Sequence, residues 1–437
     1  MAEPSKRRGM ALHTKILLGL LLGATAGVTA NIYAHDSPRL LWVVDNVAQP
    51  IGQIFLRLLF MVVVPLVFAS VTTGVASLGD ISRIGRIGGK TLLIFLGTTA
   101  IAVVVGLTLV NLIRPGESLD PSIQAQLLAE YGSQADETVA ASKGGLFGVH
   151  TFVNIVPRNP IAAAANGDML GLIFFSLMFG IALTLLNKEV SAPVLRLLEG
   201  INQAIMIIIG FAMRLAPLGV TALIFGVTAR FGFDVLRSLA LYVLTVLAAL
   251  TFHQFGVIGV LAKVVVGISP RSFFSRARAL MITAFSTSSS NATLPTTIRT
   301  AQESFGVPRE VAGFVLPLGA TMNMNGTAMF EGMTVLFLAQ VFGINLDILT
   351  QIIVVVLAVI TAIGVAGVPG GSIPLLVMVM GMVGIPGEGI ALILGVDRIL
   401  DMTRTVPNVT SDLLTSLIVA RSEKLPLVSQ EPSETAA

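Results

Sequence analysis

Charged and amide side chains recur on one face of the last apolar stretch of the chain. They are spaced by four, three, four and four residues: Asp397, Asp401, Arg404, Asn408 and Asp412. On an α-helix this spacing places all five on one side. A charge at the centre of a bilayer costs roughly 3 kcal/mol or more, so these side chains need partners or a water-filled path. Asp–Arg pairing that only holds helices together is the alternative, but buried pairs stabilise poorly, and we favour a binding site.

The residue types on this face indicate what the site binds. The planar guanidinium of Arg404 suits a carboxylate held by two hydrogen bonds, and Asp401 suits an ammonium group. Asp412 and Asn408 offer oxygen donors, which hard cations such as sodium prefer. Two hydroxyls can add hydrogen bonds, those of Thr405 and Thr327. A molecule with an ammonium group and a side-chain carboxylate matches Arg404 together with Asp401.

Three polar interruptions elsewhere in apolar sequence point to the same site. Residues 323–327 read Asn-Met-Asn-Gly-Thr, which predicts an unwound segment whose carbonyls can hold a cation; a glycine kink with hydrogen-bonded amides is the alternative. The serines and asparagine at 288–291 offer hydroxyls and backbone N–H groups to an anion. The glycine-rich stretch 367–371 allows close backbone approach and hinge motion.

Composition places these elements in a membrane. Of the 437 residues 54% are apolar and only 12% are charged, against about 25% charged in soluble proteins. Apolar runs that can cross a bilayer are expected near 14–33, 50–77, 91–113, 169–186, 198–228, 235–266, 311–342 and 388–420. Two further apolar segments, 272–300 and 350–384, are interrupted at their centres, and we interpret them as helical hairpins that enter the membrane and return. The sequence therefore predicts an all-α membrane protein with eight spans.

The placement of Lys and Arg predicts the orientation in the membrane. Basic residues cluster before the first run, at 81–90, at 187–196 and at 263–278, all on one side if eight spans alternate. Both termini are then cytoplasmic, and the long connection 114–166 lies outside. The C-terminal region twice places a broken hairpin before a long helix with a polar centre, a layout typical of transporters built from inverted repeats.

Other classes of function fit poorly. A formal net charge of +3 lacks the basic stripe that nucleic-acid binding requires. The chain has no cysteine and its four histidines are scattered, so no thiolate or histidine metal site is expected. We find no nucleophile–base pair, which argues against an enzyme. A channel or an anion leak stays open as an alternative to a transporter.

Four ordered motifs carry a family resemblance that covers nearly the whole chain. They are SSSNATLP (288–295), NMNGTA (323–328), AGVPGG (366–371) and DRILDMTRTVPNVTSD (397–412). Together they resemble the sodium-coupled glutamate/aspartate symporters of the dicarboxylate/amino acid:cation symporter family. The resemblance implies a homotrimer in the bacterial inner membrane that imports acidic amino acids with sodium by an elevator movement. A proton- or sodium-coupled C4-dicarboxylate symporter is the alternative.

The resemblance also implies a division of the chain. Cytoplasmic tails are expected at 1–12 and 423–437. A scaffold that holds the trimer comprises 13–77 and 114–234, which contain the first, second, fourth and fifth spans and the outer loop. A transport domain comprises the third span, 78–113, together with 235–422, which contain the sixth to eighth spans and both hairpins. The second hairpin is expected to be the extracellular gate.

The site residues follow by position within the motifs of the family. Arg404 and Asp401 match the residues on the side-chain carboxylate and the amino group of the substrate. The resemblance adds six further substrate contacts: Thr405, Asn408, Thr327, Ser289, Ser290 and Gly367. One sodium site matches Gly319, Asn323, Asn408 and Asp412. A second matches backbone carbonyls of Thr321, Ala362, Ile363 and Val365, and a third matches Thr98, Thr99 and Asn325.

The sequence departs from the family pattern at two places. The usual NMDGT motif reads NMNGT, so Asn325 stands where an aspartate of the third sodium site is expected, and we predict fewer coupled sodium ions. Many members carry an additional arginine near the substrate, whereas its two usual positions here hold Ser288 and Met402. Relatives that carry dicarboxylates lack the aspartate at the position of Asp401, and relatives that carry neutral amino acids lack the arginine at Arg404. Proton-coupled bacterial relatives tend to lack the carboxylate at Asp412. This sequence keeps all three residues. Their presence favours sodium and an acidic amino acid.

Overall fold

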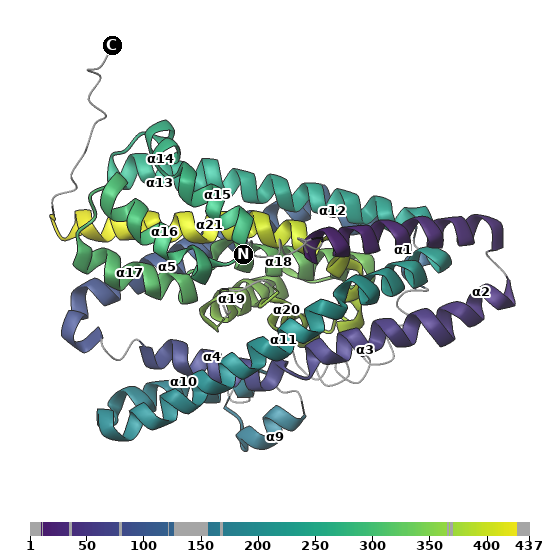
Figure 1. Cartoon of the computed structure of the whole chain (residues 1–437), viewed down its shortest axis with the longest axis horizontal. Helices are drawn as coiled ribbons and strands as arrows, with labels where there is room; N and C mark the ends of the chain where they lie inside the picture. Colours follow the sequence, from purple (N-terminus) through teal and green to yellow (C-terminus); the bar gives the residue numbers. More distant parts are fainter. Residues whose placement is uncertain are drawn as a thin grey trace, which may run out of the picture.

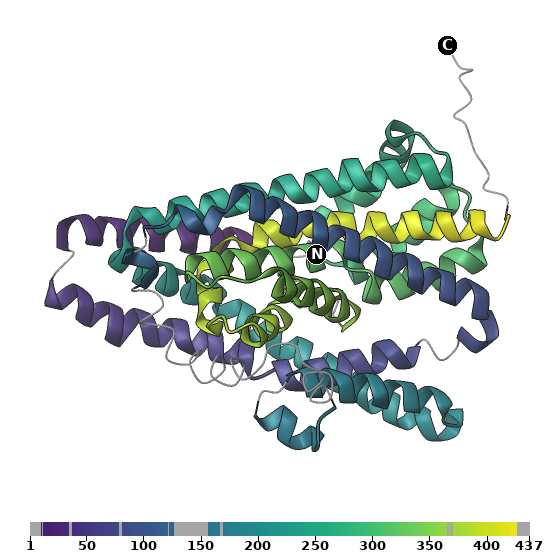
Figure 2. The same cartoon turned by 180° about the vertical axis from the view of Figure 1, so that it is seen from behind.

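Helices make up all the regular secondary structure of the described chain. The computed structural model describes residues 10, 12–34, 37–77, 81–120, 122–125, 156–166, 169–364, 367 and 370–425. Within these ranges no strand occurs. Most of the long helices run roughly along the long axis of the molecule (Figures 1 and 2). The predicted all-α class is confirmed for this part of the chain.

The N-terminal half consists mainly of long apolar helices. Its helices are α1 (Leu12–Ala34), α2 (Pro38–Val43), α3 (Gln49–Phe60), α4 (Val63–Ser77), α5 (Ile81–Ile113), α9 (Pro160–Ala165), α10 (Met169–Leu185) and α11 (Lys188–Phe231). The longest is α11, with 44 residues and internal prolines at Pro193 and Pro217. It packs against α1, α3 and α4, so one tilted helix ties these three together (Figure 1).

The C-terminal half contains shorter helices that are broken where polar sequence interrupts them. Its helices are α12 (Phe233–Thr251), α13 (Ile258–Leu261), α14 (Pro270–Arg276), α15 (Arg278–Thr287), α16 (Ser290–Arg299), α17 (Arg309–Met322), α18 (Asn325–Val341), α19 (Ile348–Gly364), α20 (Ile373–Met382) and α21 (Ile390–Ser422). The gaps between α15 and α16, between α17 and α18, and between α19 and α20 coincide with the three polar interruptions. All three predicted breaks are therefore confirmed.

The centre of this half is α18. All of its residues except Gln340 are buried. It packs against α5, α12, α19, α20 and α21, and Figure 1 shows it in the middle of the molecule, near the yellow α21. The break that begins α18 therefore lies in the interior, where the polar face of α21 meets it.

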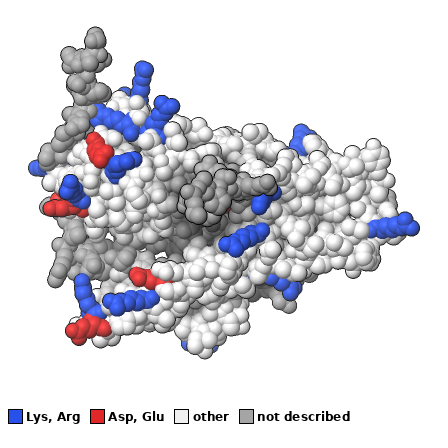
Figure 3. All heavy atoms as spheres, viewed as in Figure 1, with Lys and Arg blue, Asp and Glu red and all other residues white. Residues whose placement is uncertain are grey.

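Length and composition are those of a multi-pass membrane protein. Five helical segments of the described chain are long and apolar enough to cross a bilayer: Thr14–Ala34, Pro38–Ala76, Ile87–Ser118, Lys188–Phe231 and Phe233–Val266. Three shorter apolar helices accompany them: Gly171–Leu185, Ile348–Ile363 and Ile373–Met382. Figure 3 shows the acidic side chains and many of the basic ones gathered toward one end of this face, with separate basic side chains on a largely uncharged surface over the rest.

Some predicted boundaries are wrong. The second apolar run starts at Pro38 rather than near 50, because Pro38 at the first helical turn is a favourable helix start. The run expected at 198–228 is the interior of the longer α11. The run expected at 311–342 is two helices, as the predicted unwound segment implies, but that segment is shorter than 323–327, because only Asn323 and Met324 leave the helical conformation.

Candidate functional site

The five polar residues of the last apolar stretch all lie on α21 and are all buried. Arg404 is only 1% exposed and Asp412 only 2%. The helix begins at Ile390 and continues through Pro407 to Ser422, so its centre carries these groups deep among the other helices. The prediction that one helix presents the whole set to the protein interior is confirmed.

Arg404 is the hub of this polar set. Its Nη1 donates to Asp397 Oδ1 at 2.9 Å, and its Nη2 donates to Asp401 Oδ1 at 2.9 Å. Nη2 also donates to the Ser372 hydroxyl at 2.8 Å. The guanidinium carbon lies 4.1 Å from the ring centroid of Phe330 on α18, a cation–π contact. The fork of Arg404 is thus held in place from α18, from α21 and from the residue that precedes α20.

Asp401 joins the same group to the second hairpin tip. Its Oδ2 accepts a hydrogen bond from the Gly370 N–H at 3.3 Å and lies 3.6 Å from Nη1 of Arg398. Gly370 has a φ of 76°, a conformation that glycine adopts without strain. The hydroxyl of Thr405 donates to the Asp401 carbonyl at 2.7 Å, so it bonds to the backbone of its own helix.

Asn408 fixes the start of α18. Its Oδ1 accepts the Gly326 N–H at 2.7 Å and the Thr327 N–H at 3.3 Å, and its Nδ2 donates to the Thr327 hydroxyl at 3.1 Å. A side chain from α21 therefore satisfies the free N–H groups of the first turn of α18. A Cβ on Gly326 would lie 2.2 Å from the Arg404 carbonyl, so only glycine permits this close approach of the two helices.

A second polar group surrounds Asp412, one turn further along α21. Its Oδ1 accepts a hydrogen bond from Asn323 Nδ2 at 2.8 Å. A Cβ on Gly319 would lie 2.4 Å from the same oxygen, so the backbone of α17 approaches the carboxylate closely. Within the described residues no Lys, Arg or His nitrogen forms an ion pair with Asp412. A buried carboxylate without a cationic partner is costly, which is a reason to expect a bound cation here.

The residues of the predicted third sodium site meet beside this group. The Thr99 hydroxyl donates to Asn325 Oδ1 at 2.7 Å, and Asn325 Nδ2 donates to the Ser411 hydroxyl at 2.7 Å. The Thr98 hydroxyl lies 3.4 Å from Asn323 Oδ1. The structure therefore brings together all three predicted residues, and hydrogen bonds already engage both polar atoms of the Asn325 amide.

The two hairpin tips contact each other. Ser289 Oγ donates to the Gly367 carbonyl at 2.5 Å, and the Asn291 N–H donates to the same oxygen at 3.2 Å. Ser290 Oγ lies 3.9 Å from the sulfur of Met324, which in turn lies 3.4 Å from Asn408 Nδ2. The first tip is thereby connected to the α18 break and to α21, as the prediction requires.

The residues of the predicted second sodium site are not seen as a complete set. Ala362 is buried and Ile363 is half-buried on α19, whereas Thr321 on α17 is exposed. The Thr321 hydroxyl donates to the Leu318 carbonyl of its own helix at 3.0 Å. Val365 lies outside the described residues. Contacts between α17 and α19 do place the two helices next to each other.

Three neighbours of the site were not predicted from the residue pattern. Ser372 and Phe330 position Arg404, and Ser411 bonds to both Asn323 and Asn325. Ser411 stands on the already suspected helix, and Phe330 lies one helical turn beyond Thr327, so helical spacing would have found these two. Ser372 follows the glycine-rich tip and carries no spacing signal.

One more buried acid lies close to this region. Glu331 on α18 is fully buried, and its Oε2 accepts a hydrogen bond from the Thr361 hydroxyl at 2.7 Å. Its Oε1 has no partner among the described residues. The chain thus carries a second carboxyl group, besides Asp412, that is buried without a cationic side chain in ion-pair contact within the described chain.

Sequence comparisons relate the chain to known transport proteins. The chain is 38% identical over 413 residues to the proton/glutamate-aspartate symporter of Escherichia coli (strain K12), with 94% of this chain and 93% of the relative covered. It is 38% identical to the proton/sodium-glutamate symport protein of Geobacillus stearothermophilus, with 95% of each covered. It is 32% identical to the C4-dicarboxylate transport protein of Bacillus subtilis (strain 168), again with 95% of each covered. The sequence profile of the sodium:dicarboxylate symporter family matches residues 12–422, and the chain belongs to that family.

Proposed function

We propose that this protein is a secondary active symporter that imports acidic amino acids, glutamate or aspartate, together with sodium ions. The observation that carries the proposal is the buried guanidinium of Arg404. It is hydrogen-bonded to the carboxylates of Asp397 and Asp401 and to Ser372 beside the second hairpin tip. A site in which an arginine lies beside an aspartate suits a ligand that bears both a carboxylate and an ammonium group.

Substrate recognition would proceed by exchange of partners. The side-chain carboxylate of the substrate takes the Nη2 side of Arg404, which now bonds to Asp401 and Ser372. Asp401, released from the guanidinium, accepts the ammonium group. Asp397 keeps its 2.9 Å bond to Nη1 and holds the fork in orientation. Arg404 and Asp401 each regain a charged partner in this exchange, which limits the cost of separating them in a buried site.

The remaining substrate groups would meet the hairpin tips and the α18 break. Ser289 and Ser290 at the start of α16 offer hydroxyls and N–H groups to the main-chain carboxylate, where the helix N-terminus favours an anion. Gly367 lies against this tip. Thr327, Asn408 and Thr405 are the further contacts we propose.

Coupling ions would occupy oxygen-lined positions near the break. We propose one sodium ion between Asp412, Asn323, Asn408 and the carbonyl of Gly319, because Asp412 supplies the negative charge that a buried cation needs. We propose a second at the carbonyls of Thr321, Ala362, Ile363 and Val365. The third position, at Thr98, Thr99 and Asn325, offers no carboxylate from Asn325 and is expected to bind sodium weakly.

Transport would follow the elevator scheme of the family. We propose eight spans with two re-entrant hairpins in an inverted repeat, a scaffold at 13–77 and 114–234, and a moving domain at 78–113 and 235–422. We further propose a homotrimer in the bacterial inner membrane, with both termini, including the tails 1–12 and 423–437, in the cytoplasm. The central position of α18 between α5 and α21 supports movement of these helices as one unit.

A C4-dicarboxylate symporter is the second candidate. Relatives named as C4-dicarboxylate transport proteins share 30–32% identity with the chain, and those named for glutamate share 36–38%. Asp401 decides between the two candidates, because a dicarboxylate offers no ammonium group to this buried carboxylate.

The test is uptake of radiolabelled glutamate, aspartate and succinate into proteoliposomes with and without an inward sodium gradient. We expect uptake of an acidic amino acid that requires sodium and that Arg404→Ala abolishes. Removing two charge-assisted hydrogen bonds in a buried site weakens binding by about 100-fold or more. Succinate uptake that exceeds amino-acid uptake, or uptake that ignores sodium, would instead support the second candidate.

A further inference from the structure

A polar pocket of about 500 Å³ lies well away from the proposed transport site. It forms where the end of α5, the short helix Pro115–Ser118, the last turns of α18 and the first turn of α19 meet. The proposed transport site lies at the other end of α18, at Thr327, thirteen residues before Gln340. At 1.5 Å per residue the two are roughly 20 Å apart along the helix.

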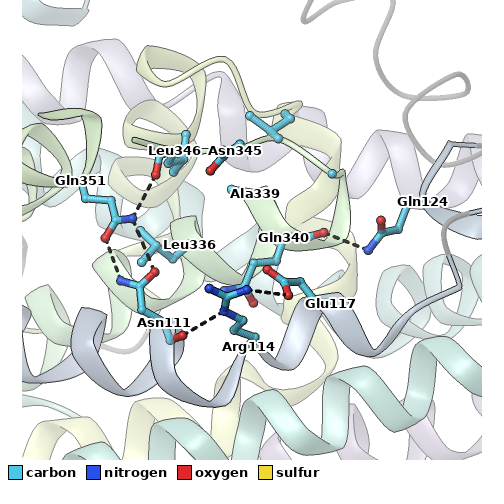
Figure 4. Close-up of a pocket in the computed structure, with 12 residues that line it drawn as sticks. Asn111, Arg114, Glu117, Gln124, Leu336, Ala339, Gln340, Asn345, Leu346 and Gln351 are labelled. Atoms are coloured by element: carbon cyan, nitrogen blue, oxygen red, sulfur yellow. Dashed lines mark hydrogen bonds and ion pairs between the residues drawn. The ribbon is translucent and has the colours of Figure 1, made fainter. Parts of the chain in front are cut away.

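The pocket contains one opposed pair of charges. Arg114 Nη1 lies 3.3 Å from Glu117 Oε2, with side chains 63% and 51% exposed. Figure 4 shows Arg114 between Asn111 and Glu117, and its Nε donates to the Asn111 carbonyl at 3.2 Å. No hydrogen bond of Arg114 Nη2 or Glu117 Oε1 to another described residue is found. Nη2 of Arg114 and Oε1 of Glu117 are therefore available to bind a ligand.

The rest of the polar lining is built of neutral carboxamides. Asn111 Nδ2 donates to Gln351 Oε1 at 2.7 Å, and Gln351 Nε2 donates to the Leu346 carbonyl at 3.0 Å. Gln340 Oε1 accepts the Gly116 N–H at 3.0 Å. These bonds fix the wall of the pocket, and Figure 4 shows those of Asn111 and Gln351. Gln124 and Asn345 complete the set of carboxamides. Most of these carboxamides are therefore already bonded within the wall, and the lining carries no net charge.

We propose that this pocket is a second, low-affinity site for a zwitterionic α-amino acid. The carboxylate of the ligand binds the guanidinium of Arg114, and its ammonium group binds the carboxylate of Glu117. Because the two charges lie side by side and cancel at a distance, a lone anion or cation gains little from them. A zwitterion satisfies both at once, and the pocket has room for it. The exposure of the pair keeps the affinity low.

The test uses the purified full-length chain carrying Asp401→Asn, which removes the proposed ammonium partner at the transport site. Glycine, the smallest zwitterion, is titrated and its binding followed by saturation-transfer-difference NMR. We expect saturable binding that falls about fivefold to tenfold when either Arg114→Gln or Glu117→Gln is added, as loss of one partly exposed charged contact predicts. Arg39→Gln, an exposed arginine outside the pocket, is the matched control and leaves glycine binding unchanged.

Three results would overturn the proposal: no saturable glycine binding, equal glycine binding in all the variants, or Arg114-dependent binding of succinate without binding of glycine. Melting curves confirm that each variant is folded. Two independent pocket variants keep the test decisive if one of them fails to fold. Because binding is measured directly, failure here leaves the uptake result for the transport site unaffected.

Discussion

Arg404 and Ser372 are joined by a hydrogen bond of 2.8 Å between Nη2 and the serine hydroxyl. Arg404 on α21 thus contacts Ser372, the residue that precedes α20. Asp401 accepts a hydrogen bond from the nearby Gly370 N–H. The two residues proposed to bind the substrate therefore also fasten the second hairpin tip. Because a substrate carboxylate would compete with Ser372 for the same nitrogen, ligand binding and release of this tip are linked.

Ser372→Ala should raise the affinity for acidic substrate. The bond from Arg404 to Ser372 stabilises the ligand-free protein and is lost when a substrate carboxylate takes Nη2. Removing the serine hydroxyl therefore removes a competing hydrogen bond worth about 0.5–1.5 kcal/mol, which is roughly two- to tenfold in affinity. Binding of labelled aspartate to purified protein measures the change. Ser286→Ala, which removes an exposed hydroxyl bonded within its own helix, is the control. A weaker affinity in Ser372→Ala would show that Ser372 contacts the substrate instead.

Asp401→Asn should separate amino acids from dicarboxylates. The variant keeps the size of the side chain but removes the charge that pairs with an ammonium group. We expect aspartate binding to weaken by about 30-fold or more, as for loss of a buried charged contact, and succinate competition to change far less. Competition of both ligands against a labelled substrate measures this. Equal weakening of the two would make Asp401 only a structural partner of Arg404.

Gly319→Ala should damage the proposed first sodium site. The new Cβ would lie 2.4 Å from Asp412 Oδ1, so the carboxylate has to move. Gly313→Ala on the same helix meets nothing within 4 Å and is a matched control for the added methyl group. We expect the sodium concentration for half-maximal uptake to rise by about tenfold or more in Gly319→Ala alone. An unchanged sodium dependence would place the ion elsewhere.

Asn325→Asp should strengthen the third cation position. In this chain the Asn325 amide bonds to Thr99 and Ser411 and offers no charge, whereas an aspartate adds the charge that a desolvated cation needs. We expect a steeper dependence of uptake on sodium concentration and a larger number of sodium ions per substrate. Reversal potentials in proteoliposomes at fixed gradients measure that number. A wild-type value of three would show that Asn325 already permits full occupancy.

The polar face of α21 and the helix breaks could be predicted from sequence for one physical reason. Charges are costly inside a bilayer unless a site needs them, and non-helical backbone is tolerated there only inside the protein or beside a water-filled cavity. Charged and helix-breaking residues therefore stand out against apolar sequence. The 4-3-4-4 spacing from Asp397 to Asp412 and the start of α18 at Asn325 both follow from this contrast.

Other features of the fold and of the site could not be predicted, because they depend on contacts that residue spacing does not encode. Ser372 reaches Arg404 only because the second hairpin folds back onto α21, and Asn408 caps α18 from 82 residues away in sequence. The length of α11 was missed because prolines and charges in its first turns resemble a boundary, although Pro193 lies within the helix. Tertiary packing decides the positions of Ser372 and Asn408.

The central claim is that sodium drives the uptake of acidic amino acids. The most direct test is accumulation of labelled aspartate in proteoliposomes that have an inward sodium gradient, with ionophores holding the proton gradient and the membrane potential at zero. We predict accumulation above the external concentration that collapses when sodium is equal on both sides. Accumulation that needs a proton gradient and is indifferent to sodium would contradict the account.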